Sequence, residues 1–391
     1  MLTPWLAGSS AVSNLSLGKP TAQIASAISS HDNWLYQAEN HGGSHWVANA
    51  EAEVTYTLIG GDCVPVTILR GRPSNSSYVA SPHAAWISYP YAEAMNMMAG
   101  WRQPAAKLFA LSLATPLSAM MRVSNLDRAA IIANHLLSTN LHPHWNADHL
   151  RQATPRLIKQ FPHRPLMMRS ICRAVDADLA DGLEANGWRL IPARQIYLVD
   201  PREADVWRHN HLKRDRKLLL GSDLELVSPQ QLRAEDLPAL RTLFRQLFLD
   251  KHCALNPDFT PAFFNHCFEH GFLDLFALRL DGRLVGVLGV LERNGWATTP
   301  LIGYDLQLPQ TLGLYRRLMA LLFVEAQRRG CRLHLSSGAG TFKSARGGMP
   351  HMEYTAVYDR HLYPLQRRAI ASFAGWMDRA VPWALSKTDH K

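Results

Sequence analysis

Cysteine pairs and long apolar runs are scarce in this chain of 391 residues. The five cysteines are dispersed and none forms a C-x-x-C pair. This excludes a disulfide framework, a zinc ribbon and a C-x-x-C redox motif. The longest uncharged apolar stretch, Leu108–Met121, spans 14 residues and contains Pro116, so it predicts a core helix rather than a membrane span. We expect a reduced, cytoplasmic protein with no integral membrane segment.

Lysine and arginine are absent from the first 18 residues, so the charged start of a secretory signal peptide is missing there. Proline and glycine, at 23 and 24 residues, are scattered without a period, which excludes collagen-like and low-complexity sequence. The hydrophobic fraction of 47% is close to the globular average, so disorder is excluded as the main state.

Positive charge is unevenly placed along the chain, whose formal net charge is +9. Residues 1–200 hold 15 Lys and Arg against 13 Asp and Glu, whereas residues 201–391 hold 26 against 19. We therefore expect the second half to bind an anion such as phosphate, nucleotide or RNA. The sharpest basic cluster consists of Lys213, Arg214, Arg216 and Lys217. We interpret it as a candidate nucleic-acid contact, with a solvated helix face as the alternative.

Alternating patterns in the first half predict a small α/β unit at residues 49–200, after an irregular lead-in at residues 1–48. Predicted strands are Glu51–Ile59, Val64–Leu69, Pro165–Cys172 and Trp188–Val199, and predicted helices are Lys107–Met121, Arg128–Leu137 and Asp176–Ala185. The turn Gly60-Gly61-Asp62 indicates that the first two strands form a hairpin.

The second half repeats this order in residues 222–362. Predicted strands are Leu224–Val227, Leu273–Leu280, Leu284–Leu291, Ala297–Leu306 and Arg332–Leu335, and predicted helices are Glu235–Leu249, Pro261–Glu269 and Thr311–Arg329. Residues 201–221 predict a helix that links the two domains. Residues 363–391 predict a C-terminal helix docked on the core, with an amphipathic helix on a membrane surface as the alternative. The fold class is therefore α/β with mixed sheets, in two tandem domains joined by a helix.

Three strands, a long helix and a further strand over residues 273–335 resemble the core of the GNAT acyltransferase fold. The most specific part is Gly303–Arg346, where Tyr304 and Asp305 end a strand and a Gly-rich stretch closes on Phe342 and Lys343. The two halves resemble the Fem-type tandem GNAT proteins over roughly residues 50–360. The resemblance implies two tandem GNAT-like domains, with the donor site in the second.

The segment before the long helix is similar to the phosphate-binding loop of ordinary GNAT enzymes, which reads Gln/Arg-x-x-Gly-x-Gly/Ala. Backbone N–H groups of that loop hold the pyrophosphate of coenzyme A. Gln310 and Gly313 fit the pattern, but Tyr315 stands where a small residue lets phosphate approach the backbone. The resemblance implies Gln310, Thr311 and Gly313 as binding residues for acyl-CoA, with a glycine needed only for packing as the alternative.

Fem-type enzymes share this fold but take their acyl group from aminoacyl-tRNA, and a Phe-Lys pair belongs to the donor end of their site. Phe342 and Lys343 match that pair in type and position, and Arg346 can share the same anion. A basic second half is what a tRNA acceptor stem needs, because phosphate contacts dominate such affinity. The resemblance therefore implies a donor end built from Phe342, Lys343 and Arg346.

Aminolysis of an ester or thioester needs a neutral amine, a stabilised oxyanion and a protonated leaving group. Asp305 is the first candidate for the general base, because it ends the strand that points at the expected acyl site; a turn carboxylate is the alternative. Tyr304 is a candidate proton donor, and Lys343 a candidate for oxyanion stabilisation. His252 is a possible second base, with a surface histidine as the alternative.

These patterns predict an acyltransferase that forms an amide-type bond with an amine or hydroxylamine acceptor. Aminoacyl-tRNA is the favoured donor, acyl-CoA is the alternative donor, and a non-catalytic RNA-binding protein is the third interpretation. The acceptor is expected to be a small molecule or a peptide-like amine, and His83 and Trp86 are candidates to line its site. We expect no tightly bound cofactor, and no metal site, because the histidines form neither H-E-x-x-H nor a facial triad.

Overall fold

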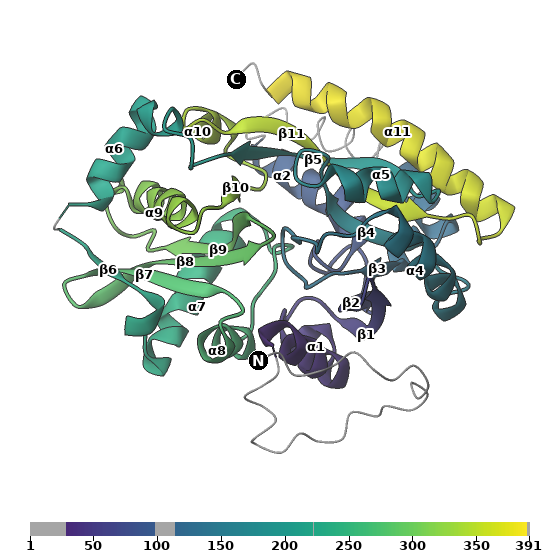
Figure 1. The fold of residues 1–391 in the computed structure, drawn as a ribbon, viewed down its shortest axis with the longest axis horizontal. Helices are drawn as coiled ribbons and strands as arrows, with labels where there is room; N and C mark the ends of the chain where they lie inside the picture. The colour runs from purple at the N-terminus through teal and green to yellow at the C-terminus, as the bar shows by residue number, and fades with distance from the viewer. Residues whose placement is uncertain (1–28, 98–113, 222, 389–391) are drawn as a thin grey trace, which may run out of the picture.

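A computed structural model describes residues 29–97, 114–221 and 223–388, and one mixed sheet crosses the whole molecule (Figure 1). Its strands are β1 Ala52–Ile59, β2 Asp62–Leu69, β3 Ala130–Ile132, β4 Leu166–Ile171, β5 Arg189–Val199, β6 Glu225–Val227, β7 Asp274–Leu280, β8 Arg283–Arg293, β9 Trp296–Tyr304, β10 Arg332–His334 and β11 Met349–Tyr358. The helices are α1 Ser30–His41, α2 Tyr89–Met97, α4 Ala147–Gln160, α5 Ala177–Ala185, α6 Asn210–Leu219, α7 Leu237–Arg245, α8 Pro261–His270, α9 Leu314–Arg328, α10 Gly340–Ser344 and α11 Pro364–Thr388.

The two halves of the chain exchange their last strands. The sheet order is β1-β2-β3-β4-β11-β5-β10-β9-β8-β7-β6. Each half contains one parallel pair, β3 with β4 and β9 with β10. β11, the last strand of the second half, lies antiparallel to β4, and β5, the last strand of the first half, lies antiparallel to β10. Because β5 and β11 also pair with each other, the halves share one continuous sheet.

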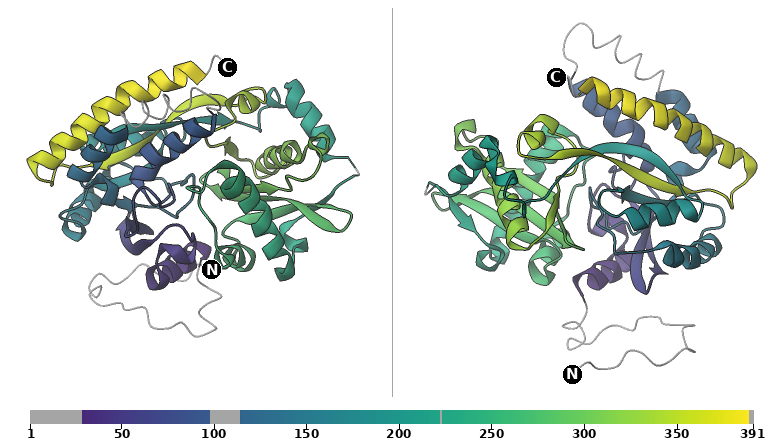
Figure 2. Two further views of the ribbon diagram at one scale, coloured as in Figure 1. Left: turned by 180° about the vertical axis from the view of Figure 1, so that it is seen from behind. Right: turned by 45° about the horizontal axis from the view of Figure 1, so that its top comes forward.

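Helices cover both faces of the first half (Figure 2). Leu166 and Met168 of β4 pack with residues of α4 and α5, whereas Met167 packs with Phe373 and Met377 of α11 on the opposite face. This alternation follows from the two-residue period of side chains along a strand that is buried on both faces. The predicted C-terminal helix therefore docks on the core, as expected.

The second half is covered in the same way, by α7 and α8 on one face and by α9 and α6 on the other. Val287 and Leu301 belong to the core cluster under α7 and α8, whereas Leu288 and Ile302 belong to the cluster under α9. α1 joins the first of these clusters, because Trp34 and Phe272 stack with ring centroids 6.2 Å apart. A helix from the start of the chain thus packs against the second half.

The mixed α/β fold and most strands agree with the sequence-based prediction. The hairpin of β1 and β2 is confirmed, and so are the three antiparallel strands β7, β8 and β9. Of the helix predicted at Lys107–Met121, residues 114–123 are helical and residues 107–113 lie outside the described part. No helix in the described part has the length and apolar character needed to cross a membrane.

Three predicted elements need correction. The helix expected at Arg128–Leu137 is wrong, because β3 occupies Ala130–Ile132 and all three of its residues are buried. The irregular lead-in contains α1, whose first turn is capped by Ser29 through the backbone N–H of Asp32. In the predicted linking helix at residues 201–221, α6 occupies only Asn210–Leu219.

Candidate active site between the two halves

A β-bulge in the central strand pair places two charged residues opposite each other. Glu353 of β11 pairs with Arg194 of β5, but its neighbour Tyr354 pairs with Pro192, so Ala193 is left without an opposing residue. Pro192 has no N–H to donate to the ladder, which is why a proline favours a bulge over a regular central strand. The bulge lies at the point where the two halves meet.

A second bulge lies on the other side of β11 at the same level. Arg169 and Ser170 of β4 together oppose Thr355, because the register shifts between the residues that flank it. Ser170 has a φ of 61°, in the left-handed region that residues other than glycine rarely adopt. Bulges beside a site commonly redirect a side chain, and here both flank the strand that carries Glu353.

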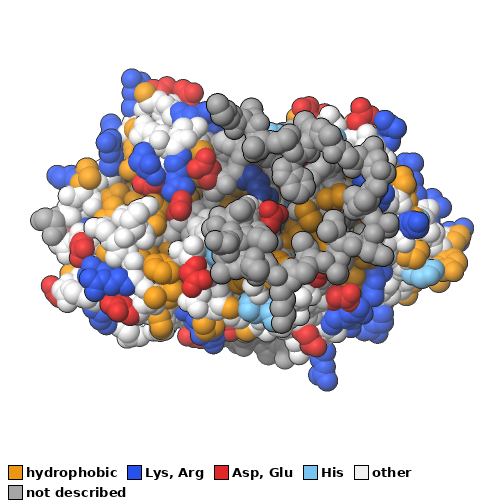
Figure 3. Space-filling view, turned by 60° about the horizontal axis from the view of Figure 1, so that its bottom comes forward, with side chains coloured by type: hydrophobic (Ala, Val, Ile, Leu, Met, Phe, Trp, Pro, Cys, Tyr) orange, Lys and Arg blue, Asp and Glu red, His pale blue; other side chains and the backbone are white. Residues whose placement is uncertain are grey.

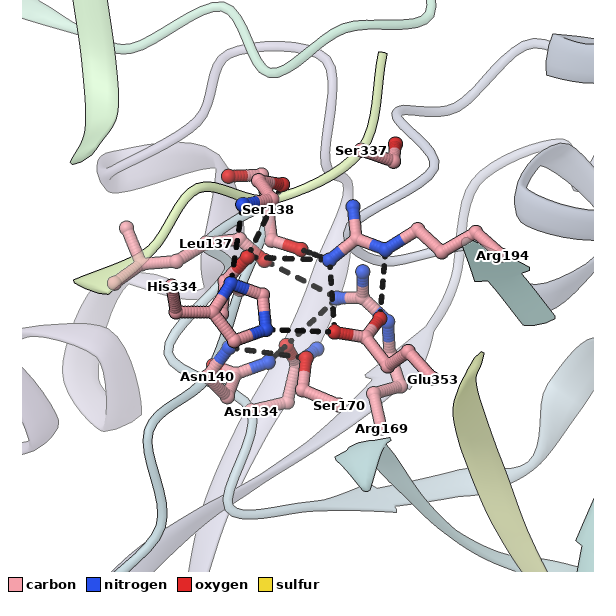
Figure 4. A network of polar contacts seen from close by, with 12 residues as sticks. Asn134, Leu137, Ser138, Asn140, Arg169, Ser170, Arg194, His334, Ser337 and Glu353 are labelled. Carbon is pink, nitrogen blue, oxygen red and sulfur yellow. Dashed lines mark hydrogen bonds and ion pairs between the residues drawn. The ribbon is translucent and has the colours of Figure 1, made fainter. Parts of the chain in front are cut away.

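Arg194, Glu353 and His334 form a buried polar network at this level (Figure 4). Arg194 donates to Glu353 through Nε at 2.6 Å and through Nη2 at 3.2 Å. The Nε2 atom of His334 lies 3.4 Å from Oε2 of the same carboxylate, and its Nδ1 accepts a hydrogen bond from the backbone N–H of Ser336. A neutral imidazole with its proton on Nε2 satisfies both contacts.

Burial and charge set the protonation states of this network. Arg194 and His334 hold the pKa of Glu353 at about 2, against the opposing effect of burial, so the carboxylate is ionised at neutral pH. Burial lowers the pKa of His334 despite the nearby carboxylate. With two guanidinium groups, Arg194 and Arg169, around one carboxylate, the network carries a net positive charge.

Arg169 is held by the loop that follows β3. Its Nη1 donates to the carbonyl oxygens of Val79 and Leu137 and to Oδ1 of Asn134, at 3.1 to 3.3 Å. Three further residues near the network, Ala133, Leu136 and Ser336, have φ between 53° and 59°. Backbone held in this region by its surroundings tends to cluster at functional sites.

A cavity of about 300 Å³ opens in front of the network. Arg169, Arg194 and Glu353 are among the residues that line it, together with Trp86 and Glu93. Trp86 lines this cavity, and its predicted place in the acceptor site stays a prediction. His83 does not line it, and both its ring nitrogens lie 3.0 Å from seryl hydroxyls, those of Ser88 and Ser118.

Lys343 lies behind the cavity wall rather than in the open cavity. Its side chain is 4% exposed, and Nζ donates to the carbonyl oxygens of Ser336 and Ser337 at 3.2 and 2.7 Å. Ser337 lines the cavity, so Lys343 fixes part of its wall. Burial, reinforced by Arg194, lowers the pKa of Lys343 to about 7. The predicted role of Lys343 at an oxyanion stays a prediction.

Lys343 is expected to titrate near neutral pH, because burial penalises its ammonium form. Carbon-13 NMR of the lysine side chains, assigned with the K343R variant, measures this directly. We expect one resonance with an apparent pKa of about 7. A pKa near 10.5 for that resonance contradicts the buried placement, and an exposed lysine such as Lys159 serves as the internal reference.

Asp305, Tyr304 and His252 do not line this cavity. Oδ1 of Asp305 accepts from the backbone N–H of Gln307 at 2.9 Å, and its Oδ2 lies 3.1 Å from the Arg283 guanidinium. Burial raises the pKa of Tyr304, and His252 is exposed at the end of a π-helical segment, Gln246–His252. Their catalytic roles remain predictions.

The segment that resembles a phosphate-binding loop is covered by α6. Gly313 is buried, and a Cβ placed on it would lie 2.6 Å from Cδ2 of Leu218. Its φ of 61° also requires the left-handed region. Gln310 and Thr311 remain exposed. The geometry therefore explains the glycine by its conformation and by the close approach of α6, without a role in binding phosphate.

Aromatic and basic residues of the predicted donor end pack against one another beside this loop. The Phe342 ring lies 4.9 Å from the Tyr315 ring, and the Arg346 guanidinium lies 3.3 Å from the centre of the Phe342 ring. Arg346 also donates to the carboxylate of Asp215 at 2.6 Å. Phe342, Lys343 and Arg346 are therefore close in space, but Arg346 already has an anionic partner.

The carboxylate of Asp215 fixes α6 in place. Asp215 is fully buried and accepts from Nε of Arg316 and from Nε of Arg346, each at 2.6 Å. The basic residues of the same helix point to solvent, and all four are exposed: Lys213, Arg214, Arg216 and Lys217. Figure 3 shows a face on which basic and acidic side chains are interspersed.

Residues 208–344 match the family model for an acetyltransferase (GNAT) domain. This part of the chain is a GNAT acyltransferase domain, and the protein is therefore an acyltransferase, as the sequence predicts. No curated protein sequence matches the chain.

Several solved structures resemble the fold. FemX is 9% identical, with 85% of this chain and 96% of that chain covered and a TM-score of 0.48. L-PGS from Bacillus licheniformis is 11% identical, with coverage of 88% and 96% and a TM-score of 0.45. The C-terminal domain (DUF2156) of an Agrobacterium fabrum protein described as a lysylphosphatidylglycerol synthetase is 15% identical, with coverage of 63% and 81% and a TM-score of 0.44.

The sequence-based site did not include Arg169, Arg194 or Glu353. Each lies in a strand that is otherwise largely apolar, for example Leu166–Ile171 around Arg169. A charged residue inside such a strand is a signal, because charged side chains are seldom buried without a partner. Which carboxylate faces which guanidinium depends on the exchange of β5 and β11 between the halves, and no local pattern indicates that exchange.

Proposed function

We propose that the protein transfers an aminoacyl group from aminoacyl-tRNA to an amine or hydroxylamine acceptor. The observation that carries the proposal is α6, which covers the N-terminus of α9 and turns its basic residues outward. In ordinary GNAT enzymes that N-terminus holds the coenzyme A pyrophosphate. This arrangement is consistent with a different donor, whose phosphates contact the exposed basic residues of α6 rather than the N-terminus of α9.

The cations of α6 support a polynucleotide donor. Lys213, Arg214, Arg216 and Lys217 are exposed, whereas the helix's own carboxylate, Asp215, points inward to Arg316 and Arg346. The outer surface of α6 is thus left without a compensating negative charge of its own. Such a surface suits phosphate groups, which position a nucleic acid without reading its sequence.

Under this proposal, the acceptor occupies the cavity in front of Glu353 and Arg194. The acceptor nitrogen, in its neutral form, attacks the ester carbonyl carbon of the aminoacyl-tRNA, and a C–N bond forms. The C–O bond to the ribose then breaks, the nitrogen loses a proton, and the ribose oxygen gains one. Proximity in a cavity built from both halves supplies much of the acceleration in such a reaction. Asp305 stays the general base proposed from sequence, although it does not line this cavity, and a substitution tests that role.

If Asp305 accepts the proton of the amine, the D305N variant lowers turnover at least about tenfold, since general acid–base catalysis typically contributes roughly 10²–10⁴-fold. Asparagine keeps an oxygen for the backbone N–H of Gln307, so little stability should be lost. Steady-state transfer rates and thermal unfolding are the two measurements. R283Q is the matched control, because it removes the ion pair with Asp305 but keeps the carboxylate. Full activity in D305N would exclude Asp305 as the base.

The double variant K213E/R214E is expected to weaken tRNA binding by more than tenfold at low salt. The slope of log affinity against log salt should fall by roughly 0.7–0.9 for each phosphate that the variant no longer neutralises. Filter binding at several salt concentrations measures both quantities. R156E/K159E on α4 makes the same change in net charge at exposed positions and should leave binding nearly unchanged. Equal losses in the two double variants would contradict a specific role for α6.

Acyl-CoA is the second candidate donor, favoured by the match to an acetyltransferase (GNAT) domain and by Gln310 and Gly313. Calorimetric titration with acetyl-CoA at low salt separates the two donors. We expect no binding, because Leu218 approaches Gly313 closely. Micromolar binding would move the donor to acyl-CoA. A non-catalytic RNA-binding protein, in contrast, would lose function in K213E/R214E and keep it in D305N.

A further inference from the structure

We propose that the cavity selects a small amine that also carries a carboxylate, with the carboxylate on Arg169 and the amine toward Glu93. This inference rests on the proposed function, because it names the class of acceptor that the same site would take. An amino acid, or a related compound with an amine and a carboxylate, is the chemical class that fits. The charges, the unpaired donors and the walls of the cavity all favour this class of ligand.

Arg169 is a guanidinium without a carboxylate of its own, because the nearby Glu353, which raises its pKa, is hydrogen-bonded to Arg194. Within the described residues it forms no ion pair, whereas Arg194 is matched by Glu353. All the hydrogen bonds of Arg169 go to uncharged oxygens. Burial and the neighbouring Arg194 lower the pKa of Arg169 to about 10, so it is still charged at neutral pH. A charge taken from water without a counter-ion is costly, and an anionic group of the ligand would relieve that cost.

The free edge of Arg169 has the shape that a carboxylate needs. The three bonds all come from Nη1, which leaves Nε and Nη2 without partners in the described part of the chain. These two atoms form one side of the planar guanidinium, and two parallel N–H groups match the two oxygens of a carboxylate. The bonds from Nη1 hold the group in advance, so little freedom is lost on binding.

Glu93 supplies the opposite charge elsewhere on the cavity wall. It lines the cavity from α2 and forms no ion pair among the described residues. Glu93 is absent from the charges that shift the pKa of Arg169, but it raises the pKa of Tyr89. The cavity therefore has a cationic end and a separate acidic end. A ligand with one negative and one positive group matches both ends, whereas a simple acid or a simple amine matches only one.

Two tyrosine rings connect the two ends, because Arg169 affects the pKa of Tyr78, Glu93 affects that of Tyr89, and the ring centroids lie 5.0 Å apart. Tyr78, Trp86 and Tyr89 line the cavity, and Nε1 of Trp86 is buried without a hydrogen-bond partner among the described residues. The volume of about 300 Å³ lies at the small end of the range for ligand pockets, which fits a compound of amino-acid size.

Calorimetric titration of the full chain, without any donor, tests the proposal on the ligand side. The probes are L-phenylalanine, L-lysine, 4-aminobutyrate and 6-aminohexanoate, each beside its amide and its des-amino acid. We expect at least one probe to bind, with its amide and its des-amino acid at least about tenfold weaker, as for the loss of a hydrogen bond to a charged group. Equal binding of acid and amide, or no binding by any probe, would overturn the proposal.

Variants test the two ends separately. R169M should bind the acid and the amide of the best probe equally, while R169K should keep part of the preference for the acid. E93Q should lose affinity for the amino acid but not for its des-amino acid, which makes it the matched control for R169M. Tighter binding of a dicarboxylate than of the amino acid would contradict the role of Glu93.

These experiments can support or overturn the proposed ligand class independently of the proposed function. Probe binding that depends on Arg169 supports the inference even if no aminoacyl transfer is found. Transfer from aminoacyl-tRNA to amines without a carboxylate, at the same kcat/KM as to amino acids, would leave the function standing and overturn the inference.

Discussion

Replacement of Asp215 by Asn is expected to lower the free energy of unfolding by about 3–5 kcal/mol, the range measured when one partner of a buried ion pair is removed. The carboxylate is fully buried and is shared by Arg316 and Arg346. Asparagine keeps the size but not the charge, so the Arg346 guanidinium, which is itself 5% exposed, loses its counter-ion. Urea unfolding of wild type and variant measures the difference.

The control for this prediction is R316Q. The Arg316 side chain is 43% exposed, so water replaces the lost partner and the cost should stay within about 1 kcal/mol. Hydrogen exchange adds a local readout, because α6 is attached through Asp215 and its amides should exchange faster in D215N. A variant as stable as wild type, with unchanged exchange in α6, would contradict the anchoring role of Asp215.

Replacement of Glu353 by Gln is expected to destabilise the protein by a similar amount, about 3–5 kcal/mol. Glu353 of β11 contacts Arg194 of β5 and His334 of β10, so its loss leaves Arg194 and Arg169 without a nearby carboxylate. E184Q is the control, since Glu184 pairs with Arg173 at the surface and should cost less than about 1 kcal/mol.

The lowered pKa of Glu353 makes the stability of the protein depend on pH. This pKa is depressed from 4.5 to about 2 in the folded protein, so the unfolded chain takes up the proton first. The stabilisation by Glu353 is therefore complete above pH 4.5 and is lost as the pH falls from 4.5 toward 2. Urea unfolding across this range should show a steeper loss in wild type than in E353Q. Parallel curves would contradict the ionised buried pair.

Much of the fold could be predicted from sequence because its hairpins and amphipathic helices carry local patterns. The turn at Asp281 and Gly282 and the alternation in β7 and β8 are examples. β3 could not be distinguished from a helix, because three consecutive buried residues have no period. α4 was not predicted, since it carries many polar residues and Pro155 within the helix. The domain boundaries at residues 200 and 222 stay a prediction.

The charged residues of the cavity could not be predicted from sequence. Phe342, Lys343 and Arg346 of the predicted donor end lie close together because they fall within one short segment, but none of them lines the cavity. The Arg194–Glu353 pair joins positions 159 residues apart in sequence, through a strand exchange that no local spacing encodes. At Gly313 the sequence matches the phosphate-binding motif. The structure explains the glycine by its left-handed φ and by the close approach of α6.

The most direct test of the central claim is a transfer assay with both donors in parallel. The purified full chain is supplied with hydroxylamine and either tRNA charged with labelled amino acids or labelled acetyl-CoA, and hydroxamate is measured against protein-free reactions. We predict protein-dependent hydroxamate from aminoacyl-tRNA, strongly reduced in K213E/R214E, and none from acetyl-CoA. Transfer from acetyl-CoA with none from aminoacyl-tRNA would contradict the account.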